Sequence, residues 1–279
     1  IPILLGQATS PKSALIGGIQ ANVYEQAFCR RFTGLVHDEP TVGENEIDDL
    51  QQELCAANRG KPRWSESWTI SAVEPSGRIT AQKNGISVVL WPGEYLVSDG
   101  LRFLPRLGGS VKTYIHTESL TAQTGYYFAF GESIEGREDR VEYVRFYWTI
   151  TASGAPRLVG LLTEKLNHYC VPFQLKCLHS RRRYDRLDPA VLYIDTRCYD
   201  ITAQIVAEVY PLIQENSRPL SPIFTKALAP GLALAEDPGN GTSFGMHRCG
   251  IIAEGLWEAH ATCVIEDEAR LEIVESRFT

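Results

Sequence analysis

Apolar residues near the start of the chain recur at the spacing of a helix, three and four positions apart. The two stripes are Tyr24, Phe28 and Phe32, and then Ile47, Leu50 and Leu54. Gly43 and the acidic run 44–46 precede the second stripe. Carboxylates favour a helix N-terminus because of the helix dipole, so this run is typical of the start of a helix. The pattern predicts a helical segment over residues 1–60.

From Arg63 onwards the pattern changes to short β-rich stretches separated by turn residues. The stretches are WTISAV (68–73), GRITAQ (77–82), ISVVLW (86–91) and GEYLVS (93–98), with further strands expected at 111–117, 125–131 and 141–150. Asn84-Gly85 indicates a hairpin, because both residues tolerate the positive φ that a two-residue turn requires. The segment 63–150 is therefore predicted to form a mostly antiparallel sheet.

The next stretch predicts a strand, a helix and a second strand. The strand EYVRFYWTI (142–150) precedes a helix whose stripe is Leu158, Leu161, Leu162 and Leu166. Pro156 suits the first helical turn, and Pro172 prevents the helix from continuing into the strand FQLKCL (173–178). A parallel crossover is the expected connection between two such strands.

Elements of both kinds are expected in the rest of the chain. A strand AVLYI (190–194) precedes a helix over 200–215, and another helix begins near Thr242–Ser243 and runs past Trp257. The stripe of the first helix is Ile201, Ile205, Val209 and Leu212. The proline-rich segment 217–240 is predicted to be a loop. The fold class is α+β: a mixed, largely antiparallel sheet with one βαβ crossover and flanking helices, in one compact domain over 61–279.

Side chains alternate between the two faces of a strand, so the pattern also predicts which residues share a face. Val144, Phe146 and Trp148 lie on one face of their strand, and Leu175 and Cys177 on one face of theirs. If these apolar sets face the helices, the opposite face collects Arg145, Tyr147, Lys176 and Tyr193. Two cations and two phenols are typical of an anion site, although a polar sheet face is also ordinary on a solvated surface.

Two further stretches could bind an anion. SRRRYDRLDP (180–189) holds four arginines, and AEDPGNGTSFGMHRCG (235–250) places glycines and Ser243 at a helix start, followed by His247 and Arg248. Guanidinium groups bind phosphate in a bidentate manner, and backbone N–H groups at a helix N-terminus attract anions. A solvated loop and a simple helix cap, with a core-facing or surface histidine, are the alternatives for the two stretches.

Composition excludes several classes of protein. The chain has 27 Lys and Arg against 34 Asp and Glu, a net charge of −7, which argues against a broad nucleic-acid surface. No apolar run approaches the roughly 18–20 residues of a membrane span, and a signal peptide is not recognisable. Since the chain begins with Ile1 rather than Met, its N-terminus is expected to be trimmed or continued in a longer protein.

The chemistry available to the site is narrowed by the motifs that are missing. The seven cysteines are scattered and never form C-x-x-C, which favours buried free thiols and a cytoplasmic location. The sequence contains no H-E-x-x-H, clustered histidines, G-x-S-x-G or kinase motif. An enzyme built on cations and phenols, with no cofactor and no metal, is the remaining expectation.

Several runs, in order, resemble the HopA-type effector family over about residues 60–260. They are GYYFAFGE (125–132), VRFYWTI (144–150), LNHYCVPFQLKCL (166–178), YDRLDPAVLYI (184–194) and TKALAPGLALAEDPGNGTSFGMHRC (225–249). Such domains occur in a plant-pathogen type III effector and in lanthipeptide and thioamitide biosynthesis. Through the biosynthetic members, the resemblance implies a phospho-Ser/Thr lyase that acts after a separate kinase-like protein has phosphorylated a precursor peptide.

A more distant likeness is to the phosphothreonine lyase effectors, and it implies the same fold and a role for several residues. Lys176 matches the base position, Arg186 and Tyr193 match an Arg-to-Tyr segment, and Arg248 matches a late phosphate-binding arginine. Those families place Lys-x-His on a strand where this chain has Arg145-Phe146-Tyr147. A phenol therefore stands at the position of the acid.

The leading hypothesis is a lyase that converts phosphorylated Ser or Thr of a precursor peptide to dehydroalanine or dehydrobutyrine. Its residues are Lys176 as base, Tyr147 or His247 as acid, and Arg145, Arg186, Arg248, Tyr193 and Lys226 as phosphate and substrate ligands. The alternative is a non-catalytic module that binds a phosphopeptide or leader peptide, or an effector that engages a host protein. The helices of residues 12–58 are expected either to dock the kinase or to form a packing cap.

Overall fold

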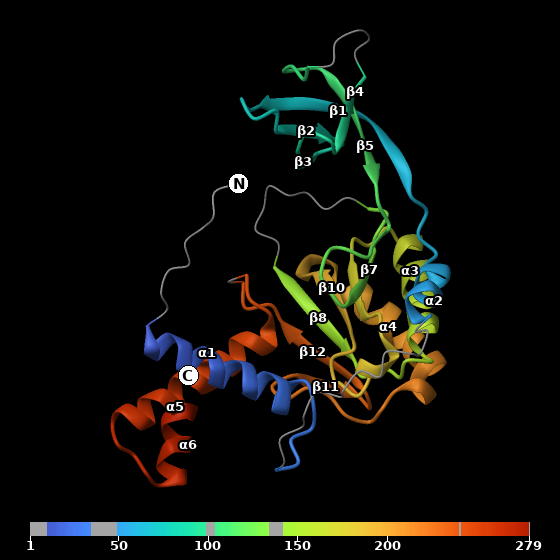
Figure 1. The fold of residues 1–279 in the computed structure, drawn as a ribbon. Helices are drawn as coiled ribbons and strands as arrows, with labels where there is room; N and C mark the ends of the chain where they lie inside the picture. The colour runs from blue at the N-terminus through green and yellow to red at the C-terminus, as the bar shows by residue number, and fades with distance from the viewer. Residues whose placement is uncertain (1–9, 35–48, 99–103, 134–141, 240, 279) are drawn as a thin grey trace.

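The computed structural model describes residues 10–34, 49–98, 104–133, 142–239 and 241–278. Within these ranges the chain forms two antiparallel sheets and six α-helices, which confirms the α+β class (Figure 1). Four short helices of other types complete the elements. They are the π-helix η1 (Tyr24–Phe28) and the 3₁₀ helices η2 (Arg181–Arg183), η3 (Thr196–Cys198) and η4 (Gln214–Asn216).

The N-terminal segment is helical, as predicted. Helix α1 (Pro11–Val23) starts with Pro11 in its first turn and runs directly into η1, while α2 (Leu50–Ala57) is a separate short helix. Phe28 is buried at the end of η1, but Phe32 lies beyond it and is 60% exposed, so the stripe was wrong at its third position. Residues 43–47, the predicted start of the second helix, lie outside the described residues.

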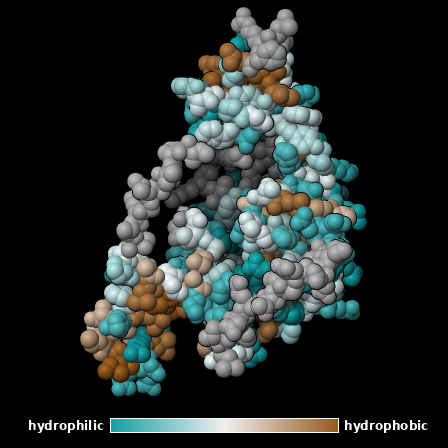
Figure 2. Space-filling model, viewed as in Figure 1, coloured by the Kyte–Doolittle hydropathy of each residue, from teal (hydrophilic) through white to brown (hydrophobic). Residues whose placement is uncertain are grey.

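The first sheet contains five strands in the order β3-β2-β1-β5-β4. They are β1 (Arg63–Val73), β2 (Ile79–Lys83), β3 (Ile86–Leu90), β4 (Tyr95–Val97) and β5 (Ser110–Ile115). Asn84 and Gly85 have φ values of 52° and 78° between β2 and β3, so the predicted hairpin is confirmed. The sheet has its own small core around Trp68, and exposed apolar side chains colour its outer end brown in Figure 2.

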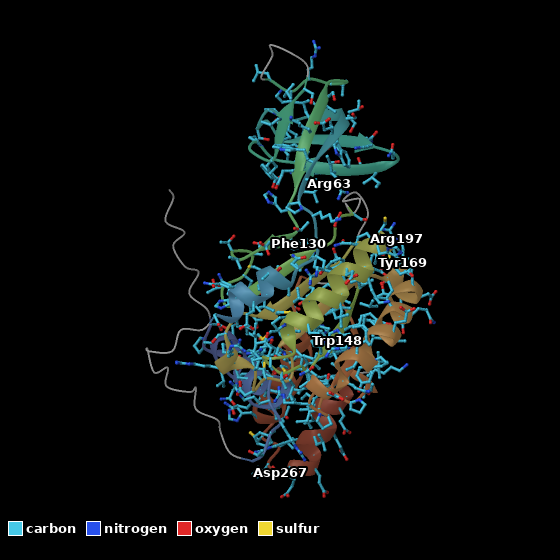
Figure 3. The ribbon with its side chains drawn as sticks, turned by 90° about the vertical axis from the view of Figure 1, so that its right-hand side faces the viewer. Arg63, Phe130, Trp148, Tyr169, Arg197 and Asp267 are labelled. Carbon is cyan, nitrogen blue, oxygen red and sulfur yellow. The ribbon has the colours of Figure 1, made fainter. Side chains whose placement is uncertain are left out.

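The second sheet contains seven strands in the order β11-β12-β8-β10-β9-β7-β6. They are β6 (Glu118–Ser119), β7 (Tyr126–Phe130), β8 (Tyr143–Trp148), β9 (Gln174–Leu178), β10 (Ala190–Asp195), β11 (Lys226–Ala229) and β12 (Leu232–Glu236). The prediction of one sheet over 63–150 was therefore wrong, since the chain passes from the first sheet to the second after Ile115. Arg63, at the base of the first sheet, forms an ion pair of 2.6 Å with Glu132 after β7 (Figure 3).

The predicted crossover runs from β8 through α3 (Ala155–His168) to β9. Both strands pair antiparallel with β10, so they run in the same direction with β10 between them. The crossover is confirmed in direction, but it spans one strand, and all pairs between described strands are antiparallel. This arrangement places the polar residues of β8 and β9 on either side of β10.

Two predictions in the second half of the chain need correction. Helix α4 (Tyr199–Ile213) buries Thr202, Ile205, Val206, Val209 and Ile213, whereas the expected stripe members Ile201 and Leu212 are exposed. Residues 217–240 contain β11 and β12 rather than a loop alone. The segment LALAE of β12 lacks β-branched residues, so its strand state comes from pairing with β8 rather than from local propensity.

The second sheet is covered on both faces. Helices α2, α3 and α4 cover the face that carries Val144, Phe146 and Trp148, as predicted; Figure 3 shows Trp148 beneath them. The opposite face is covered by η1 and by helix α5 (Phe244–Ala261), which α1 and α6 (Asp267–Ser276) flank (Figure 1). The polar face is therefore no solvated surface, because Phe28 and Phe244 pack onto it.

The contact between η1 and α5 depends on a glycine. A Cβ atom at Gly245 would lie 2.5 Å from the buried Phe28 ring, which has no room to move away. We expect Gly245→Ala to lower the free energy of unfolding by about 1–3 kcal/mol, because overpacking displaces the ring. Urea denaturation measures this change.

Gly18→Ala in α1 is the matched control for Gly245→Ala. A Cβ at Gly18 would meet no atom within 4 Å, so alanine should be neutral or stabilise the helix by up to about 1 kcal/mol. Equal effects of the two substitutions would contradict the close packing of η1 on α5.

Candidate functional site

Two neighbouring rows of side chains run across the covered face of the second sheet. The first row is Phe128, Lys176, Val191, Tyr147 and Ala233, and the second is Phe130, Gln174, Tyr193, Arg145 and Ala235. Lys176 and Tyr147 are in one row with β10 between them, about 10 Å apart along the sheet. The register therefore places Lys176, Tyr147, Arg145 and Tyr193 on one face, as alternation predicted.

The Lys176 ammonium lies over the ring of Tyr126, 3.8 Å from its centroid. Burial lowers the pKa of Lys176 to about 8, because the charged amine loses hydration. The positive charges of Arg186 and Arg145 lower this pKa further, and the carboxylate of Asp188 opposes them. A lysine with this pKa is partly a free amine near neutral pH, so it can accept a proton.

Arg145 is 6% exposed and forms an ion pair with Asp237, which follows β12. Its Nε donates a hydrogen bond of 3.0 Å to the Asp237 carboxylate. The guanidinium also lies 5.1 Å from the centroid of the Tyr193 ring. Burial raises the pKa of Tyr193 to about 12, against the effect of the nearby Arg145 charge, so this phenol keeps its proton.

The Tyr147 ring is 4% exposed and lies against two phenylalanines from the covering helices. Its centroid is 6.1 Å from that of Phe28 and 6.5 Å from that of Phe244. Burial raises the pKa of Tyr147 above its ordinary value, although Arg145 acts in the opposite direction. The phenol is therefore a proton donor with little access to bulk solvent.

Arg186 lies just before β10 and is only 2% exposed. Its Nε and Nη2 donate hydrogen bonds of 2.8 and 3.1 Å to the two carboxylate oxygens of Asp188. Nη2 also donates to the Cys29 Sγ at 2.8 Å, and Nη1 to Glu25 at 3.2 Å. The guanidinium is thus held by partners from its own strand entry and from the N-terminal segment.

Tyr24 of η1 joins the same network. Its hydroxyl donates to Asp188 at 3.3 Å and accepts from Arg186 at 3.4 Å. Burial raises the pKa of both Tyr24 and Cys29, and the charge of Asp188 raises both further. Both groups are therefore neutral at physiological pH, and Arg186–Asp188 is the charged centre of the network.

The other predicted site residues lie in different environments. Arg248 is on the first turns of α5, over the Phe244 ring at 5.3 Å, so it borders the covered face. His247 lies beside it, with a buried Nδ1 that has no hydrogen-bond partner among the described residues. Lys226 is exposed on the edge strand β11 and pairs with Leu234, on the opposite sheet face from Lys176. The structure does not bring Lys226 to the site.

Sequence reasoning missed six residues of this network: Tyr24, Glu25, Cys29, Tyr126, Asp188 and Asp237. One signal was available, because Arg186 and Asp188 are two positions apart at the entry to a strand and so point the same way. Asp237 stands in the glycine-rich stretch that was read only as a helix start. The roles of Tyr24 and Glu25 had no sequence signal, since their partners are about 160 positions away.

The described residues offer no group of three or more His, Cys, Asp and Glu side chains that could hold a metal ion. All seven cysteines are free thiols, as expected, although Cys170 and Cys263 are exposed rather than buried. None of the helices in the described parts of the chain has the length and apolar character needed to span a bilayer.

Fold and site together define an α+β protein with a cationic site on a sheet face that its N-terminal segment covers. The chain belongs to the HopA1 effector protein family, whose model matches residues 117–279. This match confirms the resemblance seen in the sequence. The matched range includes β7–β10, β12 and α5, but neither the first sheet nor the N-terminal residues Tyr24, Glu25 and Phe28.

Two solved structures are similar to the chain, and both are of effector proteins from Pseudomonas syringae. The one from pathovar tomato strain DC3000 has 14% identity and a TM-score of 0.48, covering 92% of this chain and 84% of that one. The one from pathovar syringae strain 61 has 12% identity and a TM-score of 0.41, covering 96% and 94%. No curated protein matches the chain.

Proposed function

We propose that this protein is a phospho-Ser/Thr lyase that eliminates phosphate from a phosphorylated peptide without a cofactor. The observation that carries the proposal is the environment of Lys176, a half-buried amine with a pKa of about 8 on the same sheet face as Arg145 and Tyr147. Elimination of this kind requires a base of moderate strength beside fixed positive charge. The resemblance to lyase domains supports the same assignment.

The reaction removes one proton and one leaving group. The neutral amine of Lys176 would accept the Cα proton of the phosphorylated residue. The electron pair of the Cα–H bond forms the Cα=Cβ double bond while the Cβ–O bond breaks, and phosphate leaves with that bond's electron pair. The product is dehydroalanine from phosphoserine or dehydrobutyrine from phosphothreonine.

Arginine side chains would stabilise the negative charge that develops in this reaction. Arg145 and Arg186 contribute the positive field that already lowers the pKa of Lys176. Arg248 forms no ion pair with any residue that the structure describes, so at the border of the site it could contact phosphate. Fixed guanidinium groups in a site shielded from water lower the barrier, because they need no reorganisation during the reaction.

The proton donor to the departing oxygen is proposed to be a phenol. Tyr147 and Tyr193 both retain their protons at neutral pH and both lie beside Arg145. His247 was the other candidate, but its Nδ1 is buried and has no hydrogen-bond partner in the described parts of the chain. Phenols therefore suit the role better than His247.

The substrate must come from a kinase reaction, because the lyase consumes a phosphorylated Ser or Thr. We propose that a separate kinase-like protein phosphorylates a precursor peptide of the lanthipeptide type, and that this chain acts next. A non-catalytic phosphopeptide-binding module is the second candidate. It is supported by the arginines of the site, because guanidinium groups that would stabilise a departing phosphate could equally recognise an intact phosphopeptide.

Mass spectrometry separates the two functions. A peptide carrying one phosphoserine or phosphothreonine is incubated with the protein and analysed for loss of phosphoric acid, with the unphosphorylated peptide as control. A lyase gives a dehydrated product that adds a thiol. A binding module leaves the phosphopeptide unmodified. If the folded protein gives that result, the proposed lyase activity is contradicted.

The rate of elimination should depend on pH through Lys176. Only the unprotonated amine accepts a proton, so kcat/KM should rise about tenfold per pH unit below pH 8 and level off above it. Rates measured from pH 7 to 9.5 avoid the titration of the phosphate ester, whose second pKa is about 6. A profile that falls across this range would rule out Lys176 as the base.

A further inference from the structure

The carboxylate of Glu25 lies between two arginines at the surface of the site. Its Oε2 is 2.9 Å from Nη1 of Arg30, and its Oε1 is 3.2 Å from Nη1 of Arg186. The Glu25 side chain is 41% exposed, whereas the two guanidinium groups are largely buried. Two fixed guanidinium groups that converge on one exposed anion have the form of an anion-binding site.

The other contacts of Arg186 are built into the protein. Asp188 takes two of its N–H groups, and the partly buried Tyr24 and the buried Cys29 contact Nη2. Among the described partners of Arg186, Glu25 alone is substantially exposed, and its contact is with Nη1. If the Glu25 side chain swings away, Nη1 becomes available to another anion and the rest of the network stays in place.

The backbone that carries Glu25 is firmly held, so only its side chain needs to move. Phe28 at the end of η1 is buried between Tyr147 and Phe244, and Gln20 of α1 donates to the Met246 carbonyl of α5 at 2.8 Å. Glutamate has three rotatable bonds, and its rotation breaks two contacts at a partly hydrated surface. π-Helical turns such as η1 are frequent at functional sites.

The surroundings favour a second anion once Glu25 has moved. Lys176 is within electrostatic reach of Arg186, and Arg183 acts on the same Tyr126 ring that Lys176 covers. Arg218 donates to the backbone carbonyl of Asp185, beside Arg30 and its partner. The cations of this region then outnumber its remaining carboxylates, Asp185 and Asp188.

We propose that Glu25 is a built-in occupant of an anion site formed by Arg30 and Arg186, and that a phosphate monoester displaces it. The inference rests on the proposed function for the identity of this ligand, the phosphoryl group of the substrate. Substrate binding would then exchange an internal carboxylate for the phosphate. Because residues 10–34 lie outside the range matched by the family model, this occupant is a feature of the chain's own N-terminal segment.

The test measures binding of inorganic phosphate to the full chain by isothermal titration calorimetry. We expect Glu25→Gln to bind phosphate at least tenfold more tightly than the wild type, because it removes the competing charge and keeps the size of the side chain. Glu25→Asp, which retains the charge but has a shorter reach, should fall between the two. Thermal unfolding of each variant establishes that it is folded.

Asp185→Asn is the matched control. It removes one negative charge from the other side of Arg30, where Asp185 pairs with Nε at 2.9 Å, but it does not touch Arg186. Phosphate affinity in this variant should change less than threefold. An equal gain in Asp185→Asn would overturn the proposal, since net charge alone would explain both results, and so would unchanged or weaker binding in Glu25→Gln.

The outcome is independent of the lyase assay. If Glu25→Gln gains phosphate affinity but no phosphopeptide is dehydrated, the anion site stands and the lyase function fails. If the wild type dehydrates phosphopeptide but Glu25→Gln shows no gain, the lyase function stands and the role of Glu25 fails. When both hold, Glu25→Gln should also lower the KM for phosphopeptide.

Discussion

Lys176→Met is expected to abolish phosphate elimination while it makes the folded protein more stable at neutral pH. The activity falls because the thioether cannot accept the Cα proton; general bases of this kind contribute about 10²–10⁴-fold to a rate. The stability rises because methionine fills a similar volume without a charge that burial disfavours. Opposite changes in activity and stability are typical of a residue kept for chemistry rather than for the fold.

The stability gain should depend on pH in a defined way. The pKa of Lys176 is about 8 in the folded protein, against about 10.4 for an unperturbed lysine in the unfolded chain. Below pH 8 the amine is protonated in both states, and the folded state carries the full cost of burying the charge, on the order of 3 kcal/mol. Between pH 8 and about 10.4 the folded state loses its proton first, so the cost decreases, and above that range it disappears.

Urea denaturation of the wild type and Lys176→Met at pH 7 and pH 10 measures this difference. The variant should be more stable at pH 7, and the two curves should approach each other at pH 10. Lys165→Met is the control, because Lys165 is on α3, beneath the other face of the sheet, where it pairs with Glu208. That substitution should leave elimination unchanged. Retained activity in Lys176→Met would remove Lys176 from the mechanism.

The second large effect is expected from Asp188. Asp188→Leu leaves the buried guanidinium of Arg186 without its bidentate partner, which should lower the free energy of unfolding by about 3–5 kcal/mol. The double variant Arg186→Met with Asp188→Leu removes both charges and should lose less stability than Asp188→Leu alone. Urea denaturation of four proteins, the wild type, Arg186→Met, Asp188→Leu and the double variant, forms the measurement. A double variant that loses the sum of the two single effects would contradict a coupled pair.

Asp188 also tunes the base. Its negative charge opposes the lowering of the Lys176 pKa, so its removal should lower that pKa further. Wherever the Asp188 variant remains folded, the pH at which kcat/KM levels off should move below 8. The Lys176 to Asp188 coupling is thus visible in kinetics as well as in stability. An unchanged pH profile of kcat/KM would mean that the charge of Asp188 does not affect the pKa of Lys176.

Strand alternation predicted the central part of the site correctly. The apolar members of EYVRFYWTI and FQLKCL face α3 and α4, so Arg145, Tyr147 and Lys176 share the other face. Ser243 was also placed correctly at a helix start, where its side chain accepts a hydrogen bond from the Met246 N–H. These features depend on short-range geometry, which is why a sequence pattern contains them.

Pairing between distant segments was not predictable in the same way. Local residues of β12 do not favour a strand, and its conformation is imposed by β8, which precedes it by more than 80 positions. The division into two sheets likewise depends on which strands pair with which. The sequence of each separate stretch predicts a strand but does not show its partner. In α4 the predicted stripe was one position away from the buried one at Ile201, because Thr202 is buried and Ile201 is exposed.

Local sequence patterns were enough to predict the α+β class, the family, and the sheet face on which Lys176, Arg145, Tyr147 and Tyr193 meet. Only the tertiary structure showed that η1 and α5 cover this face, and that Asp188, Asp237, Tyr24 and Glu25 surround its cations. The physical reason is that burial and charge pairing arise between residues more than 160 positions apart. The lowered pKa of Lys176 follows from that burial. Lys176 could therefore be selected as a candidate from the sequence, but its ability to act as a base could not be predicted.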